Sequence, residues 1–354
     1  MAELSTMTIG MDLGDKYSQL CVMDNASRTS LEESRVPTTK AAIARYFAVK
    51  EPSRVIMEVG THSGWISRKL TELGHQVFVA DPRRVRALAS GQDKDDALDA
   101  EFLARLGCAD VKLLKPIQHR SEQTQAALAM LRARDKLVQA RAKLINCVRG
   151  LVKTSGARLP TCSSERFHKL EDQLPPTLSG ALQPLMVSIA TMTQQVRHYD
   201  RRIEQIAETD HPQTCTLRQV AGIGPVTSLG YVLVIEDPSR FSNRRAVGAY
   251  LGLCPRRYHS GESEPELRIS KRGDNLVRRL LVTSAHYILG AFGPDCDLRR
   301  WGLAYASRGG KNAKKRAVVA VARKLAVLLH SLWTTGQTYE PLRNAQRQAK
   351  VSPA

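Results

Sequence analysis

Four carboxylates within the first hundred residues indicate most clearly what chemistry this sequence could perform. Asp12, in TIGMDLGDK, and Glu58, in RVIMEVG, each interrupt a short apolar run of the kind that forms a β-strand. A carboxylate in such a run is costly unless it is paired or bound to a metal. Asp96 and Asp99, in KDDALDA, are three residues apart on a predicted helix and therefore share one of its faces.

Carboxylates that converge in this way bind hard cations, so the four acids are predicted to hold Mg²⁺ or Mn²⁺ jointly. Two such ions can stabilise the attacking and leaving oxygens of a phosphodiester during an in-line displacement. Any one of the acids, taken alone, is also explained as a strand-end or surface residue. The ordered set of four favours metal-dependent chemistry on a phosphodiester.

The elements that must position these acids follow a recognisable order. Residues 8–37 predict three strands, which the turn signals GDK and DNAS separate. Helix and strand patterns then alternate over residues 39–49, 53–60, 62–74, 75–81 and 94–107. This order predicts a ribonuclease-H-like α/β domain over residues 1–112, with the first acid on strand one, the second at the end of strand four and the last pair on the closing helix.

Residues 113–210 predict two long helices with coiled-coil spacing. Apolar residues recur at steps of three and four, at Met130, Ala133, Leu137, Ala140, Leu144, Cys147 and Leu151, and again at Leu182, Leu185, Ile189, Met192, Val196, Tyr199, Ile203 and Ile206. The two helices either form an antiparallel hairpin within one chain or join two chains. The first helix has a second apolar stripe, which favours a homo-oligomer, at Leu131, Val138, Ile145 and Val152.

Charge separates the predicted metal site from a basic remainder. The net charge is +19, with −2 in residues 1–110 and +21 in residues 111–354, which predicts a polyanionic partner. A third unit, over 211–340, is basic and mainly helical, and 341–354 is a basic tail expected to be mobile. The predicted phosphate contacts surround a polar, glycine-containing loop and are Arg256, Arg257, Arg268, Lys271, Arg272, Arg278 and Arg279.

Other signals argue against a membrane or secreted protein. No apolar run reaches the roughly 18 residues that span a bilayer, and the first residues lack the pattern of a secretory signal. The seven cysteines are scattered and contain no CxxC pair. These features predict a cytoplasmic protein with no membrane partner and no disulfide framework.

The motifs together resemble a known family over roughly residues 8–335. MDLGDK, MEVG and KDDALDAEFLARL, followed by VAGIGPVTS, RFSNRRAVGAYLGLCPRRYHSGES and RISKRGDNLVRRLLVTSA, are similar to the DEDD-type transposases of bacterial insertion sequences, also called bridge-RNA-guided recombinases. The resemblance implies a RuvC-like first domain, in which Asp12, Glu58, Asp96 and Asp99 are the DEDD set. Asp93 and Asp95 adjoin the third acid and are alternatives to it.

The same resemblance implies a C-terminal transposase domain whose catalytic serine is Ser260, in RRYHSGES, with Ser263 and Ser270 as nearby alternatives. It implies DNA strand cleavage and exchange through a phosphoserine bond. The implied partners are donor and target double-stranded DNA, a structured guide RNA and further copies of the chain, as a dimer or as a tetramer on DNA. It also implies a bacterial protein that is associated with the nucleoid when active.

Two other functions remain open from the sequence. A metal-dependent, structure-specific endonuclease, similar to a Holliday-junction resolvase, would use the acids and water and would not need Ser260. A non-enzymatic scaffold would bind nucleic acid and use the acids only to stabilise its fold. A covalent protein–DNA adduct distinguishes the recombinase from both.

Overall fold

The computed structural model describes residues 6–88, 96–256 and 267–344, without the side chains of residues 96 and 97. The chain divides into two compact units, Met1–Ser121 and Glu122–Ala354, which are described separately. The domain boundaries that the sequence predicts after residues 112, 210 and 340 stay predictions.

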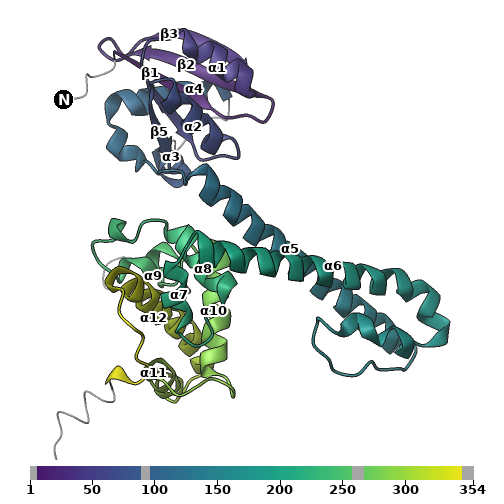
Figure 1. Cartoon of the computed structure of the whole chain (residues 1–354). Coiled ribbons are helices and arrows are strands. Elements are labelled where there is room, and N and C mark those ends of the chain that lie inside the picture. Colours follow the sequence, from purple (N-terminus) through teal and green to yellow (C-terminus); the bar gives the residue numbers. More distant parts are fainter. Residues whose placement is uncertain (1–5, 89–95, 257–266, 345–354) are drawn as a thin grey trace, which may run out of the picture. The chain divides into compact units, whose positions relative to one another are not determined.

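The first unit is a five-stranded mixed sheet with helices on both faces (Figure 1). Its elements are β1 (Met7–Asp12), β2 (Tyr17–Asp24), β3 (Ser30–Pro37), α1 (Lys40–Ala48), β4 (Arg54–Glu58), α2 (Ser63–Glu72), β5 (Gln76–Ala80), α3 (Pro82–Leu88), α4 (Asp96–Ala109) and the short 3-10 helix η1 (Val111–Leu114). The strand order is β3-β2-β1-β4-β5, in which β1 pairs antiparallel with β2 and parallel with β4. The predicted meander and the alternation that follows it are both present.

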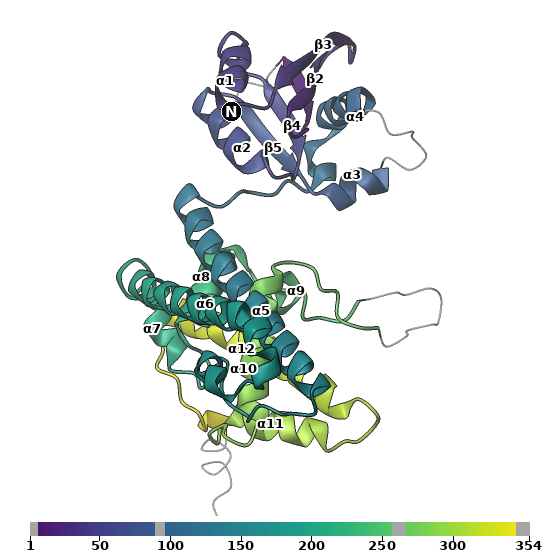
Figure 2. The ribbon, with the colours of Figure 1, turned by 90° about the vertical axis from the view of Figure 1, so that its right-hand side faces the viewer.

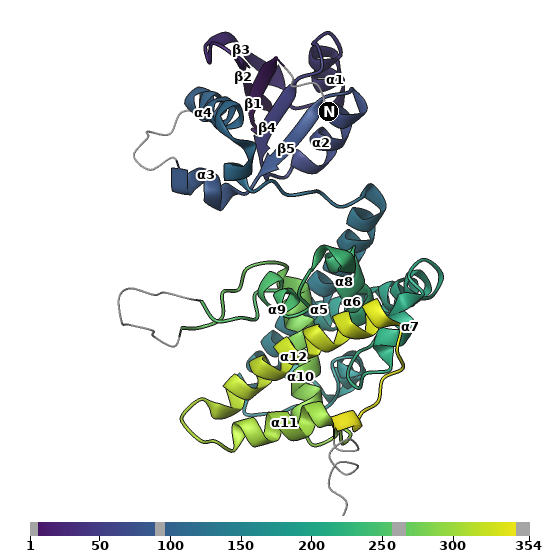
Figure 3. The same cartoon turned by 90° about the vertical axis from the view of Figure 1, so that its left-hand side faces the viewer.

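Alternation along the central strands assigns each face of the sheet to different helices. Ile9 and Met11 of β1 pack with Met57 of β4 in the cluster that includes α1 and α2 residues. Ile56 of β4 belongs to a cluster on the other face, with Leu103 of α4. Figure 3 shows α1 and α2 on one side of the sheet and α4 on the other. Because both faces are covered, β1 and β4 are buried along almost all of their length.

Helix α4 lies unusually close to β1, and Gly10 makes this possible. A Cβ atom at Gly10 would lie 2.0 Å from the carbonyl oxygen of Ala100 and 2.5 Å from the backbone nitrogen of Ala104. Gly107, farther along the helix, would place a Cβ 2.5 Å from Ile56. These contacts fix where α4 sits along the sheet, and its first turn begins at Asp96, one turn before Ala100.

The second unit is helical. Its elements are α5 (Glu122–Thr154), η2 (Phe167–Gln173), α6 (Pro176–Thr209), α7 (Gln213–Arg218), α8 (Pro225–Ile235), η3 (Pro238–Arg240), α9 (Ala246–Tyr250), α10 (Asn275–Leu289), α11 (Asp297–Ala306) and α12 (Ala313–Thr335). The predicted long helices correspond to α5 and α6, which pack against each other within one chain (Figure 1). The hairpin alternative is therefore present, and assembly with further chains stays a prediction.

The burial of α5 differs from the sequence expectation. Ile145 and Val152, from the second predicted stripe, are buried, whereas Cys147 and Leu151, from the first, are exposed. The reason is that α6 and η2 cover the side of α5 that carries Ile145, Val148 and Val152. On α6 the expected residues Leu182, Ile189, Val196 and Ile203 are buried.

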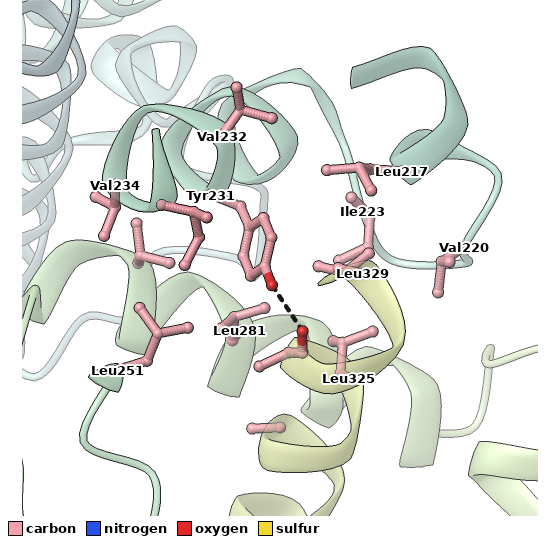
Figure 4. Packing of buried hydrophobic residues seen from close by; sticks show 14 of the residues in the cluster. Leu217, Val220, Ile223, Tyr231, Val232, Val234, Leu251, Leu281, Leu325 and Leu329 are labelled. Carbon is pink, nitrogen blue, oxygen red and sulfur yellow. Dashed lines mark hydrogen bonds between the residues drawn. The ribbon is translucent and has the colours of Figure 1, made fainter. Parts of the chain in front are cut away.

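The hairpin base and the C-terminal helices share one apolar core. Leu131 of α5 and Ile203 of α6 pack with α8, whose residues from Thr227 to Ile235 are all buried. Figure 4 shows Tyr231 of α8 reaching α12, where its hydroxyl donates to the carbonyl oxygen of Ala326 at 2.7 Å. Burial raises the pKa of Tyr231, so this hydroxyl stays protonated and remains a donor.

Helix α12 is apolar on average, although Arg323 and Lys324 interrupt its apolar residues. Within the described residues it is long and apolar enough to cross a membrane by length and composition, with a mean hydropathy of 1.4 over 18 residues. Half of that window is buried inside the protein, and Leu325 and Leu329 belong to the shared core. Its apolar composition is therefore that of a core helix. It crosses in front of α10 in Figure 3 and behind α10 in the opposite view of Figure 2.

The Gly10 contact predicts a large stability effect. Gly10→Ala should destabilise the first unit by about 3 kcal/mol, because the new methyl group meets backbone atoms that cannot rotate away. Gly60→Ala is the matched control, since no atom lies within 4 Å of a Cβ there, and it should change stability by less than about 1 kcal/mol. Urea unfolding followed by circular dichroism measures both. Equal stability of the two variants would contradict the close packing of α4.

Candidate active site

Asp12 and Glu58 lie next to each other at one edge of the sheet. Each is the last residue of its strand, and the parallel register that pairs Met11 with Met57 brings the next residue of each strand side by side. Neighbouring strands are about 4.8 Å apart, so the two carboxylates leave the backbone at closely spaced points. Both residues are half-buried. The structure thus brings together two acids that lie far apart in the sequence.

The pKa of Glu58 is affected by the charges of the other acids. Burial raises the pKa of Glu58, and the negative charges of Asp12 and then Asp99 raise it further, while Arg86 of α3 acts in the opposite direction. Asp99 of α4 is therefore within electrostatic reach of the strand-end pair, although its own side chain is exposed. Three of the four predicted acids belong to one electrostatic site.

The fourth acid is placed only by its backbone. Asp96 begins α4, but its side chain lies outside the described part, as do Asp93 and Asp95 entirely. Among the described side chains, no three His, Cys, Asp or Glu residues are close enough to form a ready metal cage. The structure therefore places the side chains of Asp12 and Glu58 at the strand ends, with Asp99 close enough to affect the pKa of Glu58.

This donor set fits a divalent cation of the Mg²⁺ class. The site offers carboxylate oxygens, which are the hard ligands that Mg²⁺ and Mn²⁺ prefer. The raised pKa of Glu58 shows that ionising it beside Asp12 is unfavourable in the protein alone. A bound cation would relieve this repulsion and favour the ionised form.

His62 is a residue at the same edge that sequence reasoning missed. It lies in the turn after β4, and its Nε2 is 3.5 Å from Oδ1 of Asp15, in the turn after β1. The indole N–H of Trp65 donates to His62 Nδ1 at 3.1 Å, so a neutral His62 carries its proton on Nε2. Its position four residues after Glu58 could have predicted this. The turns that follow two adjacent parallel strands lie at the same edge of the sheet.

The loop that contains Ser260 starts and ends at a small antiparallel pairing. Pro255 pairs with Ile269, the backbone N–H of Arg256 donates to the carbonyl of Arg268 at 3.0 Å, and that of Ser270 donates to Cys254 at 2.8 Å. Arg256 and Arg268 are exposed at this stem. Arg257, Ser260 and Ser263 lie outside the described residues.

The base of this stem is held by tight backbone packing. Gly252 has a φ of +70°, and a Cβ there would lie 2.1 Å from the carbonyl oxygen of Arg272. The guanidinium of Arg278 is buried beneath and donates to the carbonyls of Leu251 at 3.2 Å and Arg272 at 3.0 Å. Arg278 thus supports the turn from inside, which its place among basic residues in the sequence did not reveal.

The remaining predicted phosphate contacts differ in whether, among the described residues, their side chains are exposed and unpaired or already in an ion pair. Lys271 and Arg272 are exposed beside the stem. Arg279 is exposed but pairs with Asp135 of α5 at 2.7 Å, and Arg132 of α5 pairs with Asp274, the N-cap of α10, at 3.2 Å. Exposed cations therefore cluster where the loop leaves the helical unit.

The acid pair predicts a pH-dependent metal affinity. Calorimetry should show that Mg²⁺ binding strengthens as pH rises through the raised pKa of Glu58, because only the ionised carboxylate is a ligand. Asp12→Asn should weaken binding at least about 10-fold, whereas Glu101→Gln, on α4 and paired with Arg105, should not. Equal binding by wild type and Asp12→Asn would count against the site.

The stability of the metal-free protein should change with pH in the opposite sense. The pKa of Glu58 is raised in the folded state, so the unfolded chain releases this proton first. Stability from this group is therefore full below the unfolded value of about 4.3 and is lost as pH rises through the folded pKa. Glu58→Gln should remove this loss in urea unfolding at neutral pH.

Comparison with known proteins agrees with this arrangement. A transposase model, DEDD_Tnp_IS110, matches residues 9–155, and a model described as Transposase IS116/IS110/IS902 family matches residues 215–297. A probable family 20 transposase of Pseudomonas aeruginosa is 30% identical, covering 94% of this chain and 98% of the relative. The transposase for insertion sequence element IS1328 of Yersinia enterocolitica is 28% identical, covering 94% and 98%.

A more distant relative, the pilin gene-inverting protein of Moraxella bovis, is 21% identical and covers 93% of this chain and 96% of its own length. The family matches, the near-complete coverage and the mixed sheet agree on a DEDD-type domain with a ribonuclease-H-like fold, followed by a helical C-terminal part. The chain belongs to the IS116/IS110/IS902 family of insertion-sequence transposases, which are DNA-modifying enzymes.

Proposed function

We propose that this transposase cleaves and exchanges DNA strands through Ser260, with help from a divalent cation held by its acidic residues, and that a structured RNA guides it. The main support from the structure is the adjacent pair of Asp12 and Glu58, whose mutual repulsion a cation would relieve. Family membership supplies the DNA substrate. The resemblance of RRYHSGES to the family's serine motif supports Ser260.

Asp12, Glu58, Asp96 and Asp99 would hold Mg²⁺ or Mn²⁺. When bound, the cation supplies charge stabilisation at phosphate oxygens and can lower the pKa of a hydroxyl group. The protein's own contribution is to keep two carboxylates together at the strand ends and to set α4 against them through Gly10. Arg86 limits the repulsion at Glu58 while the site holds no cation.

Ser260 would act as the nucleophile. Its Oγ forms a bond to phosphorus, the bond to one strand oxygen breaks, and that oxygen leaves as a hydroxyl with the proton that the serine gives up. The resulting phosphoserine ester keeps the energy of the phosphodiester. A hydroxyl of another strand then attacks the same phosphorus and releases the serine, so strands are exchanged without ATP. Arg256 and Arg268, which are exposed at the stem, would offset the extra negative charge on phosphorus.

A guide RNA would choose the DNA sequence by base pairing, which leaves the protein to bind backbones and shapes. The abundance of cationic residues, 53 Lys and Arg, beside an aromatic content of 5% supports backbone binding. The name of the Moraxella relative describes inversion of a gene, a process that requires both ends of a segment to be cut and rejoined. Donor and target DNA would meet the enzyme in the bacterial cytoplasm, at the nucleoid.

A metal-dependent, structure-specific endonuclease is the second candidate. The described acid pair supports it, because a cation at Asp12 and Glu58 suffices for attack by water on a phosphodiester. This function would not require a serine.

The exposed stripe of α5 supports assembly into a dimer, or a tetramer on DNA. Cys147 is exposed and Leu151 is 42% exposed, although both continue the coiled-coil spacing that begins at Met130. A second copy of the chain would cover this stripe.

Ser260→Ala tests the reaction class. The variant should lose strand exchange by at least about 10³-fold, as expected when a nucleophile is removed, while its fold and its Mg²⁺ binding stay unchanged. A wild-type reaction that is stopped and digested should contain DNA linked to the peptide bearing Ser260, detectable by mass spectrometry. Ser270→Ala tests the alternative serine in the stem of the same loop and should keep strand exchange if Ser260 is the nucleophile.

Each other outcome has a definite meaning. Strand exchange by Ser260→Ala would refute the serine mechanism as stated. Metal-dependent nicking by that variant, without any adduct in the wild type, would support the endonuclease. Asp12→Asn should prevent adduct formation if the cation activates the serine.

Light scattering tests the assembly. Leu151→Asp should shift the protein from a dimer or larger species towards the mass of one chain, because a charge is costly in an apolar interface. Val187→Asp is the control, since Val187 is 56% exposed on α6 and is not among the residues with coiled-coil spacing. Buried Ile189 is unsuitable, because a charge there would disrupt the hairpin itself. A wild-type protein that stays monomeric with nucleic acid would contradict the proposal.

A further inference from the structure

A cleft of about 740 Å³ in the helical unit is lined by none of the four acids and shares only Cys254 with the stem of the Ser260 loop. Its walls come from α11, α12, the residues before α9 and the segment that follows α12. Figure 3 shows α11 and α12 lying side by side along this part of the unit. The volume falls within the range of about 300–1,000 Å³ that is typical of sites for small molecules.

The net positive charge of the residues that line the cleft favours an anionic ligand. Five of its lining residues are cationic and two are acidic: Arg244, Arg245, Arg323, Lys324 and Arg343 against Asp297 and Glu340. Asp297 is partly neutralised, because its carboxylate accepts from the backbone N–H of Asn344 at 2.7 Å. Arg245 and Arg323 are exposed and make no ion pair within the described residues. Free guanidinium groups are the side chains best suited to phosphate.

An aromatic surface lies between these cations. Trp301 is half-buried in the cleft, and its ring stacks with Tyr305 one turn along α11, with centroids 5.5 Å apart and planes at 24°. The ammonium of Lys324 lies over the Trp301 ring at 4.2 Å from its centroid. A cation in this position is held by only about 0.5–1 kcal/mol when it is exposed. A flat group could therefore replace it on the ring and leave the ammonium free to contact a neighbouring phosphate.

The wall formed by the chain after α12 is already fixed in place. The N–H of Asp297 donates to the carbonyl of Pro341 at 2.8 Å, and the N–H of Tyr339 donates to Gln219 Oε1 at 2.8 Å. Because the segment is tied at both points, little ordering is needed when a ligand enters, and preorganisation of this kind favours affinity.

We propose that this cleft binds a single-stranded segment of nucleic acid, with an unpaired base stacked on Trp301 and its flanking phosphates bound by Arg245, Arg323 and Lys324. A duplex fits this chemistry poorly, because its bases present only their edges. Stacking platforms flanked by cations are the usual means of binding single strands without regard to sequence. The inference rests on the nucleic-acid substrate of the proposed function but not on Ser260 or on a metal.

Fluorescence anisotropy with labelled 12-nucleotide probes tests the cleft in the full-length protein. Single-stranded DNA, RNA of the same sequence and the corresponding DNA duplex are compared without divalent metal. Trp301→Ala should weaken binding of at least one single strand about 5- to 100-fold, which corresponds to the loss of one stacked base, and should change duplex binding less than about twofold. The strand that loses more affinity identifies whether the base comes from RNA or DNA.

Two further variants keep the test decisive. Trp301→Phe preserves a stacking surface and should retain most of the affinity, which separates stacking from a folding defect. Arg323→Gln should lower the salt slope for single strands by about 0.7, whereas Arg202→Gln, an exposed residue of α6, should not. Equal losses on single strands and duplex, or none with Trp301→Ala, would overturn the proposal. Ser260→Ala should bind the single strand normally, so a failed serine mechanism leaves this result intact.

Discussion

The contact between Gly10 and Ala100 is the constraint on which the acidic site depends. A helix can approach a strand this closely only where the strand has no side chain, and here a Cβ would lie 2.0 Å from a backbone oxygen. The contact sets the height of α4 against β1, and so determines which residues of its first turn lie near Asp12. Sheet register performs the same task for Glu58. The acids are thus positioned by backbone packing, and this packing holds them together in spite of their mutual repulsion.

The helical unit positions its basic loop in a comparable way, although with buried cations in place of glycine alone. Arg278 donates to two backbone carbonyls beneath the stem, and ion pairs from α5 reach both Asp274 and Arg279 at the start of α10. Removing a buried guanidinium from such a site leaves carbonyls without partners and is costly. The exposed arginines that would contact phosphate are therefore supported from beneath by the buried guanidinium of Arg278.

Much of the first unit could be predicted from the sequence because its signals are local. Strand alternation and the turn signals predicted the sheet, with Asp12 on the first strand and Glu58 at the end of the fourth, where the structure has them. Burial on α5 could not be predicted, because both of its apolar stripes have helical spacing and only the path of α6 decides between them. The buried, supporting position of Arg278 could not be predicted and His62 was missed for the same reason, since the surroundings of both come from segments distant in the sequence.

The distribution of charge connects the two units in function. Carboxylates gathered for a metal repel one another when no cation is bound. Burial, and then the charges of Asp12 and Asp99, raise the pKa of Glu58 for this reason. The same acids would repel a DNA backbone if they lay on a wholly acidic protein. Residues 111–354 carry a net charge of +21, which attracts the polyanion over a distance set by salt. In the proposed mechanism, these cations would bring the phosphate to the protein, and Mg²⁺ held by the carboxylates would then allow it to approach them.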